Sequence, residues 1–226
     1  MEITARMRAV LDFVQEADTA ADVGCDHGFV SAALVMEGRA KKVAACDVSA
    51  QSLRKTEELV REYGLKQIET LVFDGLAGLA GRELDCIILA GMGGLLIRDI
   101  LAGGIAGVRG KKELVLAPQG NEYELRAFLY ENGYHICDEA IVKDGTHYYQ
   151  VIFARQGRKT PPDDVFLHFG YYPVKRKEAL QKEFLRHKLR EYETIAERAQ
   201  SGKDTREYVA EKREMCKRIA EVLKCL

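Results

Sequence analysis

The stretch TAADVGCDHGFVSAALVMEG, residues 19–38, has the form of a strand, a turn and a helix. An apolar run ends at Gly24, and a second glycine, Gly28, precedes a helical pattern that closes at Gly38. Glycines at such a turn let the backbone approach a ligand, and the start of the helix offers unpaired N–H groups. The segment therefore predicts a strand–helix unit with a ligand site at its turn.

The same alternation continues along the chain. Ser49 and Gly64 stand where they would cap the next helix at its two ends. Further strands are expected at residues 42–47, 68–74, 84–91, 113–118, 134–142 and 147–155, and helices at 3–14, 50–63, 95–101 and 122–131. Only four residues separate the last two strands, which predicts a hairpin. The pattern predicts an α/β fold with a mostly parallel, doubly wound sheet that contains one antiparallel strand.

Composition bounds the class of protein. The 226 residues are 47% apolar and leave room for one α/β domain with a smaller appendage. A net charge of -1 excludes a uniformly basic nucleic-acid-binding protein, although not a basic patch. There is no apolar run of roughly 18 residues and no pattern of an export signal, so we expect a cytoplasmic protein without a membrane span. The six cysteines lack CxxC spacing and are expected to be reduced thiols.

A domain boundary is expected at QGRKTPPDD, residues 156–164, which contains two of the four prolines. We place an α/β domain at 1–157 and a helical domain at 158–226. Two long helices are expected at 175–199 and 205–226, joined around Ser201 and Gly202, and their apolar residues follow the three-four rhythm of a packed helical pair. The expected seam comprises Leu185, Leu189, Tyr192, Ala196 and Ala199 with Tyr208, Met215, Ile219, Val222 and Leu226, and Lys212 fills its missing position. From Lys175 onward, 15 basic against 10 acidic residues make this part about +5.

Four segments follow predicted parallel strands, where ligands bind in such sheets. The first spans residues 22–28 and has the spacing D-x-G-x-x-x-G instead of the dinucleotide pattern G-x-G-x-x-G. Its Asp26 would repel a pyrophosphate and would suit a positively charged ligand. A tight turn with two structural glycines is the alternative interpretation.

The other three segments supply carboxylate acceptors for hydrogen bonds and backbone groups that no side chain covers. Asp47, followed by Val48, stands where an acid accepts hydrogen bonds from both ribose hydroxyls of an adenosine, although it could instead act near the Ser49 cap. Asp74-Gly75-Leu76 could accept from an adenine amino group or form an ordinary Asp-Gly turn. Residues 90–94, Ala90-Gly91-Met92-Gly93-Gly94, carry three glycines where a simple loop needs one.

Three stretches together resemble the bacterial tRNA (adenine-22-N1)-methyltransferase family: ADVGCDHGF at 21–29, LAGMGGLLI at 89–97 and LAPQGNEYELRAFLYENGY at 116–134. The resemblance covers essentially the whole chain. It implies a Rossmann-like class I methyltransferase domain that uses S-adenosyl-L-methionine, followed by a coiled-coil-like helical domain that binds tRNA. Cys25 and Gly28 depart from the small hydroxyl residue and the alanine of the family. Residues 117–121, APQGN, depart from the Q-P-N of the family, so either Gln119 or Asn121 takes the place of the family asparagine near the target base.

The resemblance implies methyl transfer to N1 of adenine and suggests roles for single residues. The adenine N1 already owns a lone pair, so the site acts mainly by positioning. The absence of a D/N-P-P-Y motif also favours a ring nitrogen over an exocyclic amine. His27 could be an acid–base group, but we favour a role in orienting the loop. Expected cofactor-binding residues are Asp22, Gly24, Asp26, His27, Gly28, Asp47, Val48, Asp74, Gly75, Leu76, Ala90, Gly91, Met92 and Gly93, and the catalytic candidates are Asp26, His27, Met92, Gln119 and Asn121.

The remaining expectations concern metal and partners. Cys25, His27 and Cys46 fit no zinc spacing, so we expect no metal. Tyr148 and Tyr149 either stack on a flipped base or pack the sheet. The set expected to contact tRNA phosphates, unless it is only a solvated helix face, is Lys175, Arg176, Lys177, Arg186, Lys188 and Arg190. No protein partner is implied, and a monomer is expected.

Three other functions remain as alternatives. A methyltransferase of a small molecule or protein would share the cofactor site and would not need the tail. A dinucleotide-dependent oxidoreductase is disfavoured by Asp26 and by the absent central glycine. A non-catalytic tRNA-binding protein that keeps the fold would bind tRNA without transferring a methyl group.

Overall fold

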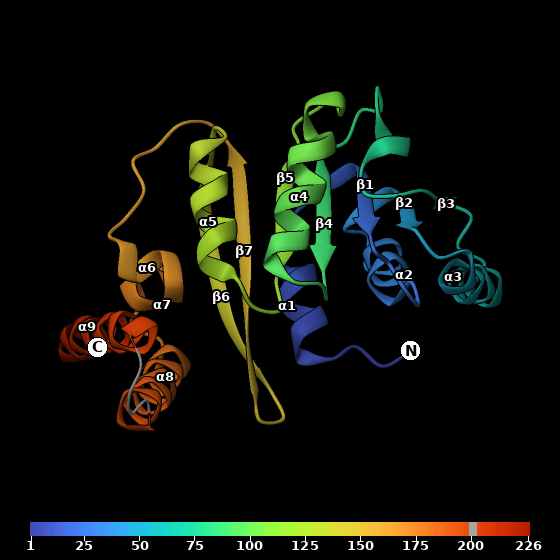
Figure 1. The fold of residues 1–226 in the computed structure, drawn as a ribbon. Coiled ribbons are helices and arrows are strands. Elements are labelled where there is room, and N and C mark those ends of the chain that lie inside the picture. The colour runs from blue at the N-terminus through green and yellow to red at the C-terminus, as the bar shows by residue number, and fades with distance from the viewer. Residues whose placement is uncertain (199–202) are drawn as a thin grey trace. The chain divides into compact units, whose positions relative to one another are not determined.

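The computed structural model describes residues 1–198 and 203–226. They form two compact units, Met1–Pro161 and Pro162–Leu226. The elements of the first unit, seen in Figure 1, are α1 (Ala5–Phe13), β1 (Ala17–Val23), α2 (Phe29–Met36), β2 (Ala40–Asp47), α3 (Ala50–Tyr63), β3 (Ile68–Val72), η1 (Ala77–Leu79), β4 (Cys86–Ala90), α4 (Gly94–Gly104), η2 (Ile105–Gly107), β5 (Glu113–Ala117), α5 (Glu122–Glu131), β6 (Tyr134–Asp144) and β7 (His147–Gln156).

The seven strands form one sheet in the order β3-β2-β1-β4-β5-β7-β6. Neighbours from β3 to β5 are parallel, whereas β7 runs antiparallel to both β5 and β6. The predicted mostly parallel sheet with one antiparallel strand is therefore confirmed. Its strand order reverses between β1 and β4, which makes their carboxyl ends the place where a ligand is expected.

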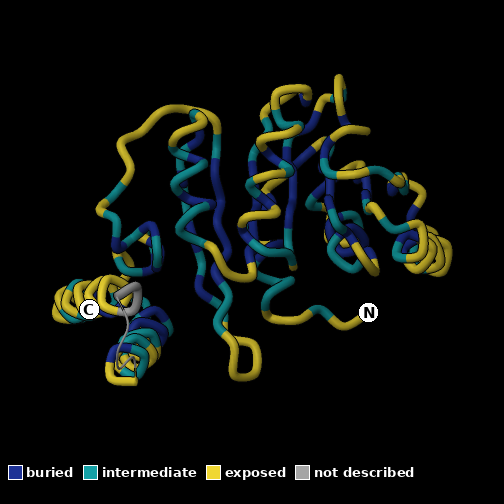
Figure 2. The backbone as a smooth tube through the Cα atoms, viewed as in Figure 1, coloured by how far each residue is buried: buried dark blue, intermediate teal, exposed yellow. Residues whose placement is uncertain are grey.

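Helices cover both faces of this sheet. The connections through α2 and α3 step outward from β1 in one direction, and those through α4 and α5 step in the other. Because such crossovers are right-handed, the two pairs lie on opposite faces. α4 packs beside α5, and α1 packs against α2 (Figure 1). The central strands are buried between these layers (Figure 2), and Ile87, Ile88 and Leu89 on β4 have no exposed surface.

Local caps set the bounds of the best-predicted helix. The Ser49 side chain accepts a hydrogen bond from Ser52 N at 3.2 Å, and Gly64 ends α3 with a φ of 66°. α3 and α5 have the predicted bounds. The predictions were less accurate elsewhere, because α1 is shorter than residues 3–14 and α4 extends beyond residues 95–101.

The second unit consists of α6 (Asp164–Phe169), α7 (Tyr172–Lys175), α8 (Ala179–Arg198) and α9 (Lys203–Cys225). The prediction of one helix from residue 175 was wrong. The chain leaves the helical conformation at Lys177, whose φ is 56°, and α8 begins two residues later. The predicted junction at Ser201 and Gly202, together with Ala199 of the seam, lies outside the described residues.

α8 and α9 pack against each other, but the seam enters α9 one residue later than predicted. Val209 is buried, whereas Tyr208 is 46% exposed, so the assignment of Tyr208 to the seam was wrong. Lys212 covers this exposed tyrosine, with its Nζ 5.0 Å from the Tyr208 ring centroid and 4.9 Å from that of Tyr192. These contacts of the ammonium with aromatic faces explain why a lysine fits at a position where the helical pattern calls for an apolar residue.

All six cysteines are free, as expected, and Cys25, Cys46 and Cys86 are buried. Within the described part of the chain, no helix combines the length and the apolar character needed to cross a bilayer.

Candidate functional site

The turn after β1 is held against β2 by backbone hydrogen bonds. Gly24 N and Cys25 N both donate to the carbonyl oxygen of Cys46, at 2.8 and 3.0 Å. Gly24, Asp26 and Gly28 all adopt positive φ, at 76°, 47° and 72°. A Cβ atom on Gly28 would lie 2.5 Å from the Thr56 side chain, so any larger residue here would require Thr56 to shift. The turn is thus a compact loop whose backbone faces the carboxyl ends of the strands.

Asp22 at the end of β1 is a buried carboxyl, with 4% of its surface exposed. Its Oδ2 accepts hydrogen bonds from Ser31 N and Ser31 Oγ, in the first turn of α2. Burial raises the pKa of Asp22 to about 6, the Ser31 hydrogen bonds oppose this, and the charge of Asp47 adds to it. Asp22 therefore ties β1 to α2 and also brings acidic character to the mouth of the sheet.

Asp47 at the end of β2 is fixed by two backbone N–H groups. Asp26 N donates to its Oδ2 at 3.1 Å, and Ser49 N donates to its Oδ1 at 2.8 Å. The residue is half-buried. Each carboxylate oxygen keeps a further lone pair for a ligand, so Asp47 is a preoriented acceptor.

His27 contacts Lys55, Asp26 and Phe29. Its Nε2 lies 3.2 Å from Lys55 Nζ and 3.5 Å from Asp26 Oδ2, and its ring stacks on Phe29 with centroids 5.5 Å apart. A lysine ammonium can only donate, so Nε2 accepts from Lys55 and has no proton to donate to Asp26. The Lys55 contact and the stacking on Phe29 hold the imidazole beside the turn.

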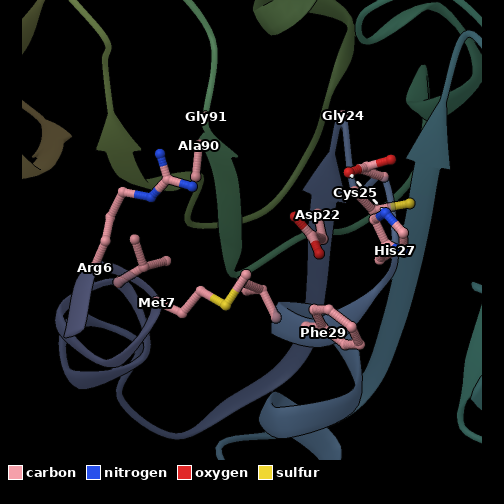
Figure 3. Close-up of a pocket in the computed structure, with 12 residues that line it drawn as sticks. Arg6, Met7, Asp22, Gly24, Cys25, His27, Phe29, Ala90 and Gly91 are labelled. Carbon is pink, nitrogen blue, oxygen red and sulfur yellow. Dashed lines mark ion pairs between the residues drawn. The ribbon is translucent and has the colours of Figure 1, made fainter. Parts of the chain in front are cut away.

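A cavity of about 230 Å³ opens between α1, the turn after β1 and the end of β4 (Figure 3). It brings together six of the predicted residues: Asp22, Gly24, Asp26, His27, Ala90 and Gly91. Arg6, Met7 and Phe29 also line it, although nothing in the sequence pattern marked them as site residues. Figure 3 shows Arg6 reaching from α1 toward Ala90 and Gly91. In this part of the sequence, the only signal was the helical spacing of apolar residues. That spacing indicates a helix packed against the core and does not indicate a ligand site.

A second cavity, of about 280 Å³, lies between the end of β3 and α4. Its lining includes Asp74, Gly75 and Leu76, which were predicted together, and the apolar side chains of Leu96 and Ile100. Gly75 has a φ of 57°, and a Cβ atom there would lie 3.4 Å from Ile100. Asp74 thus lines a cavity that holds both apolar side chains and a second acid, Asp99. Val48 lies outside both linings and is 69% exposed.

The loops after β4 and β5 are joined to each other. Gln119 N donates to Met92 O at 2.9 Å, and Gly94 N donates to Gly120 O at 3.0 Å. A Cβ on Gly94 would lie 2.5 Å from the carbonyl oxygen of Asn121, so only glycine permits this approach. Gln119 and Asn121 are both exposed, and Asn121 has a φ of 56°.

Met92 packs back toward the first turn, because its Cε is the atom that a Cβ on Gly24 would strike, at 2.5 Å. The backbone of Gly93 precedes the first residue of α4. The four predicted segments are thus brought to one edge of the sheet.

The residues predicted to contact RNA fall in both units. In the first unit, the guanidinium of Arg6 lies 5.0 Å from the Tyr149 ring centroid, and Lys143 Nζ lies 5.4 Å from that of Tyr148. Adjacent strand residues face opposite sides of the sheet, so the two tyrosines do not form one platform. In the second unit, Lys175, Arg176 and Lys177 are exposed at the junction of α7 with α8, and Arg186, Lys188 and Arg190 lie on α8. Of these, Arg176 pairs with Glu178 and Lys188 pairs with Glu191.

The family model of a methyltransferase domain matches residues 3–152. The chain belongs to this methyltransferase family. The matched range contains the whole carboxyl edge of the sheet, with all four segments described above.

Individual relatives resemble this methyltransferase over nearly its full length. The tRNA (adenine(22)-N(1))-methyltransferase of Bacillus subtilis is 27% identical over 99% of this chain and 96% of its own. The crystal structure of the B. subtilis M1A22 tRNA methyltransferase TrmK has a TM-score of 0.88 and 25% identity, covering 98% of this chain and 99% of that one. Streptococcus pneumoniae Sp1610 in complex with S-adenosyl-L-methionine has a TM-score of 0.86 and 25% identity, covering 98% of this chain and 100% of that one.

Proposed function

We propose that this methyltransferase transfers a methyl group from S-adenosyl-L-methionine to N1 of adenine 22 in tRNA. The observation that carries the proposal is the preoriented Asp47 carboxylate beside the glycine turn, at the point where the strand order reverses. Similarity to the B. subtilis tRNA (adenine(22)-N(1))-methyltransferase over 99% of the chain supports the choice of substrate.

The residues at the carboxyl edge fit an adenosyl sulfonium. Asp47 would accept hydrogen bonds from the ribose hydroxyls, and Asp74 in the second cavity would accept from the adenine amino group. Asp22 and Asp26 give the first cavity acidic character, which favours a cation and disfavours a pyrophosphate. Gly24, which has a positive φ, lines this cavity with its backbone. Leu76 lines the second cavity, and Gly28, Val48 and Gly93 are further candidate contacts along the same edge of the sheet.

Bound S-adenosyl-L-methionine supplies an electrophilic methyl group on a sulfonium. Because adenine N1 carries a lone pair, this chain needs to orient the base and does not need to deprotonate it first. The carbonyl groups of Gly91 and Met92, the Asp26 carboxylate, and Gln119 or Asn121 are the acceptors that would face a target adenine as it gains positive charge. The same acceptors are candidates for the proton that later leaves its amino group. His27 would hold the turn in place.

The second unit would supply contacts with RNA. The exposed cations at the α7–α8 junction and on α8 fit the phosphate backbone, whose contacts dominate affinity. Extruding a paired adenine costs a few kcal/mol, which phosphate contacts and stacking on Tyr148 or Tyr149 would offset. With a tRNA substrate, we propose a cytoplasmic enzyme that acts as a monomer. Light scattering of the protein with and without tRNA tests its oligomeric state.

The decisive experiment is incubation of unmodified tRNA with labelled S-adenosyl-L-methionine, followed by nucleoside analysis. We expect 1-methyladenosine in wild-type tRNA and none in a tRNA whose adenine 22 is replaced by guanine. Label at another nucleoside would refute the assigned position. Binding of tRNA without transfer would favour the non-catalytic alternative, and transfer to a small molecule or a protein would favour the other methyltransferase class.

A further inference from the structure

Arg6 is a cation at the candidate site for which the predicted chemistry has no role. It lies in the first turn of α1, where the Thr4 side chain caps the helix by accepting from Met7 N at 3.3 Å. It is half-buried and lines the 230 Å³ cavity, and its guanidinium reaches toward the end of β4 (Figure 3). The cap and the helix therefore fix where this charge enters the cavity.

Arg6 differs from the nearby arginines in the groups that its side chain contacts. Arg8, two residues further along α1, binds both oxygens of Glu37 at 2.8 Å, and Arg39 pairs with Glu37 and Asp12. Among the residues that the structure describes, none forms an ion pair with Arg6. Its guanidinium instead lies 5.0 Å from the Tyr149 ring centroid. A cation–π contact holds the group in place and leaves its N–H donors available.

The charges around the cavity are divided between two sides. Arg6 brings a positive charge from α1, and Asp22 and Asp26 bring acidic side chains from β1 and its turn. A ligand that carries an anion and a cation a few bonds apart matches such a division. A free α-amino acid group is of this kind, because its carboxylate and its ammonium share one carbon atom.

We propose that Arg6 binds the carboxylate of the amino-acid part of the methyl donor, with Tyr149 holding the guanidinium in position. The inference rests on the proposed function, because it takes S-adenosyl-L-methionine as the donor. It gives α1, at the start of the chain, a part in binding, and it gives Tyr149 a role besides stacking on RNA. The planar fork of arginine suits a carboxylate better than a lysine ammonium does.

The test compares two donors by calorimetric titration without tRNA. S-adenosyl-L-methionine has the carboxylate, and decarboxylated S-adenosylmethionine keeps the sulfonium and the ammonium but lacks it. For Arg6→Gln we expect about a 10- to 100-fold loss of affinity for the first ligand and less than about a 2-fold change for the second. Arg6→Lys should fall between Arg6→Gln and the wild type.

Arg8→Gln is the matched control, because it removes the same charge from the same helix outside the cavity. It should change neither affinity, and circular dichroism should show each variant folded. An equal loss for both ligands, or no loss for either, would overturn the assignment of Arg6 while the proposed function stands. If the wild-type protein binds neither ligand, both proposals fail.

Discussion

Asp22 Oδ2 accepts two hydrogen bonds from Ser31, one from Oγ at 2.6 Å and one from the backbone N at 3.1 Å. The pair joins the end of the central strand β1 to the first turn of α2. Because the carboxyl is buried, its charged form is disfavoured in the folded protein, and the pKa of Asp22 rises to about 6.

This pKa makes the stability of the protein depend on pH in a direction opposite to that of most carboxyls. The folded protein holds the Asp22 proton more tightly than the unfolded chain does, so the resulting stabilisation is complete below about pH 4 and is lost as the pH rises through about 6. Asp22→Asn keeps the acceptor for Ser31 and cannot ionise. We expect the free energy of unfolding of Asp22→Asn relative to wild type to rise by up to about 3 kcal/mol from pH 4 to pH 7. Urea denaturation across this range measures the difference, and parallel pH profiles would contradict the prediction.

Asp47→Ala should weaken binding of S-adenosyl-L-methionine by about 1–3 kcal/mol, because it removes charge-assisted hydrogen bonds to two hydroxyls. Calorimetric titration provides the measurement. Asp18→Ala is a suitable control, because Asp18 is an exposed acid near the opposite end of β1, paired with Lys41. Unchanged affinity in Asp47→Ala would remove Asp47 from the cofactor site.

Gly28→Ala should destabilise the protein by about 1–3 kcal/mol through both its positive φ and the contact of the new Cβ with Thr56. Gly38→Ala isolates the first effect, since Gly38 has a φ of 69° and no atom within 4 Å of the added Cβ. Gly28→Ala should therefore have the lower midpoint in urea denaturation. Adding Thr56→Ala should recover part of the loss, even though it removes the hydrogen bond from Thr56 Oγ1 to Asp26 O. Equal effects of the two glycine substitutions would show that Thr56 moves aside freely.

Charge reversal at Lys175, Arg176 and Lys177 should weaken tRNA binding and flatten its dependence on salt, because fewer counterions are released. Filter binding at several salt concentrations gives the slope. The same charge change at Lys41, Lys42 and Lys66, three lysines of the first unit that line a different cavity, serves as the control. A slope unaltered by the first triple substitution would place the RNA contacts elsewhere.

Glu139→Gln should cost about 3–5 kcal/mol of stability, because it leaves the Arg126 charge buried beside a neutral partner. The Arg126 Nε donates to Glu139 Oε1 at 2.8 Å, and the side chains are 1% and 3% exposed. Glu69→Gln breaks a pair with Arg82 whose side chains are 55% and 38% exposed, and should cost less than about 1 kcal/mol. Chemical denaturation of both variants makes the comparison, and similar costs would show that burial does not matter here.

Much of the first unit could be predicted because its signals are local. α3 has capping residues at both ends, and the apolar run of β4 indicates a strand buried on both faces. The four segments of the candidate site could be located for the same reason, since each directly follows a strand. Which of Gln119 and Asn121 faces a substrate base has no such signal, because both are exposed on one short loop.

The sequence-based predictions failed where the structure depends on packing between residues that are far apart in the chain. Lys177 adopts a positive φ without being glycine, and no nearby residue indicates that the helix stops there. Tyr208 fits the apolar rhythm, but a neighbouring position, Val209, packs inward. Arg6 lies far along the chain from β4, so only the folded protein brings it to Ala90 and Gly91.

The hydrogen bonds that join Met92 to Gln119 and Gly94 to Gly120 tie the loops after β4 and β5 to each other. Under the proposed function, an adenine that reaches the rim that these loops form must first leave its stack. Nucleotides in weak or mismatched pairs leave their stack at a lower cost than those in strong pairs. Selection at this rim would therefore follow how easily each position of the RNA opens, in addition to which base it carries.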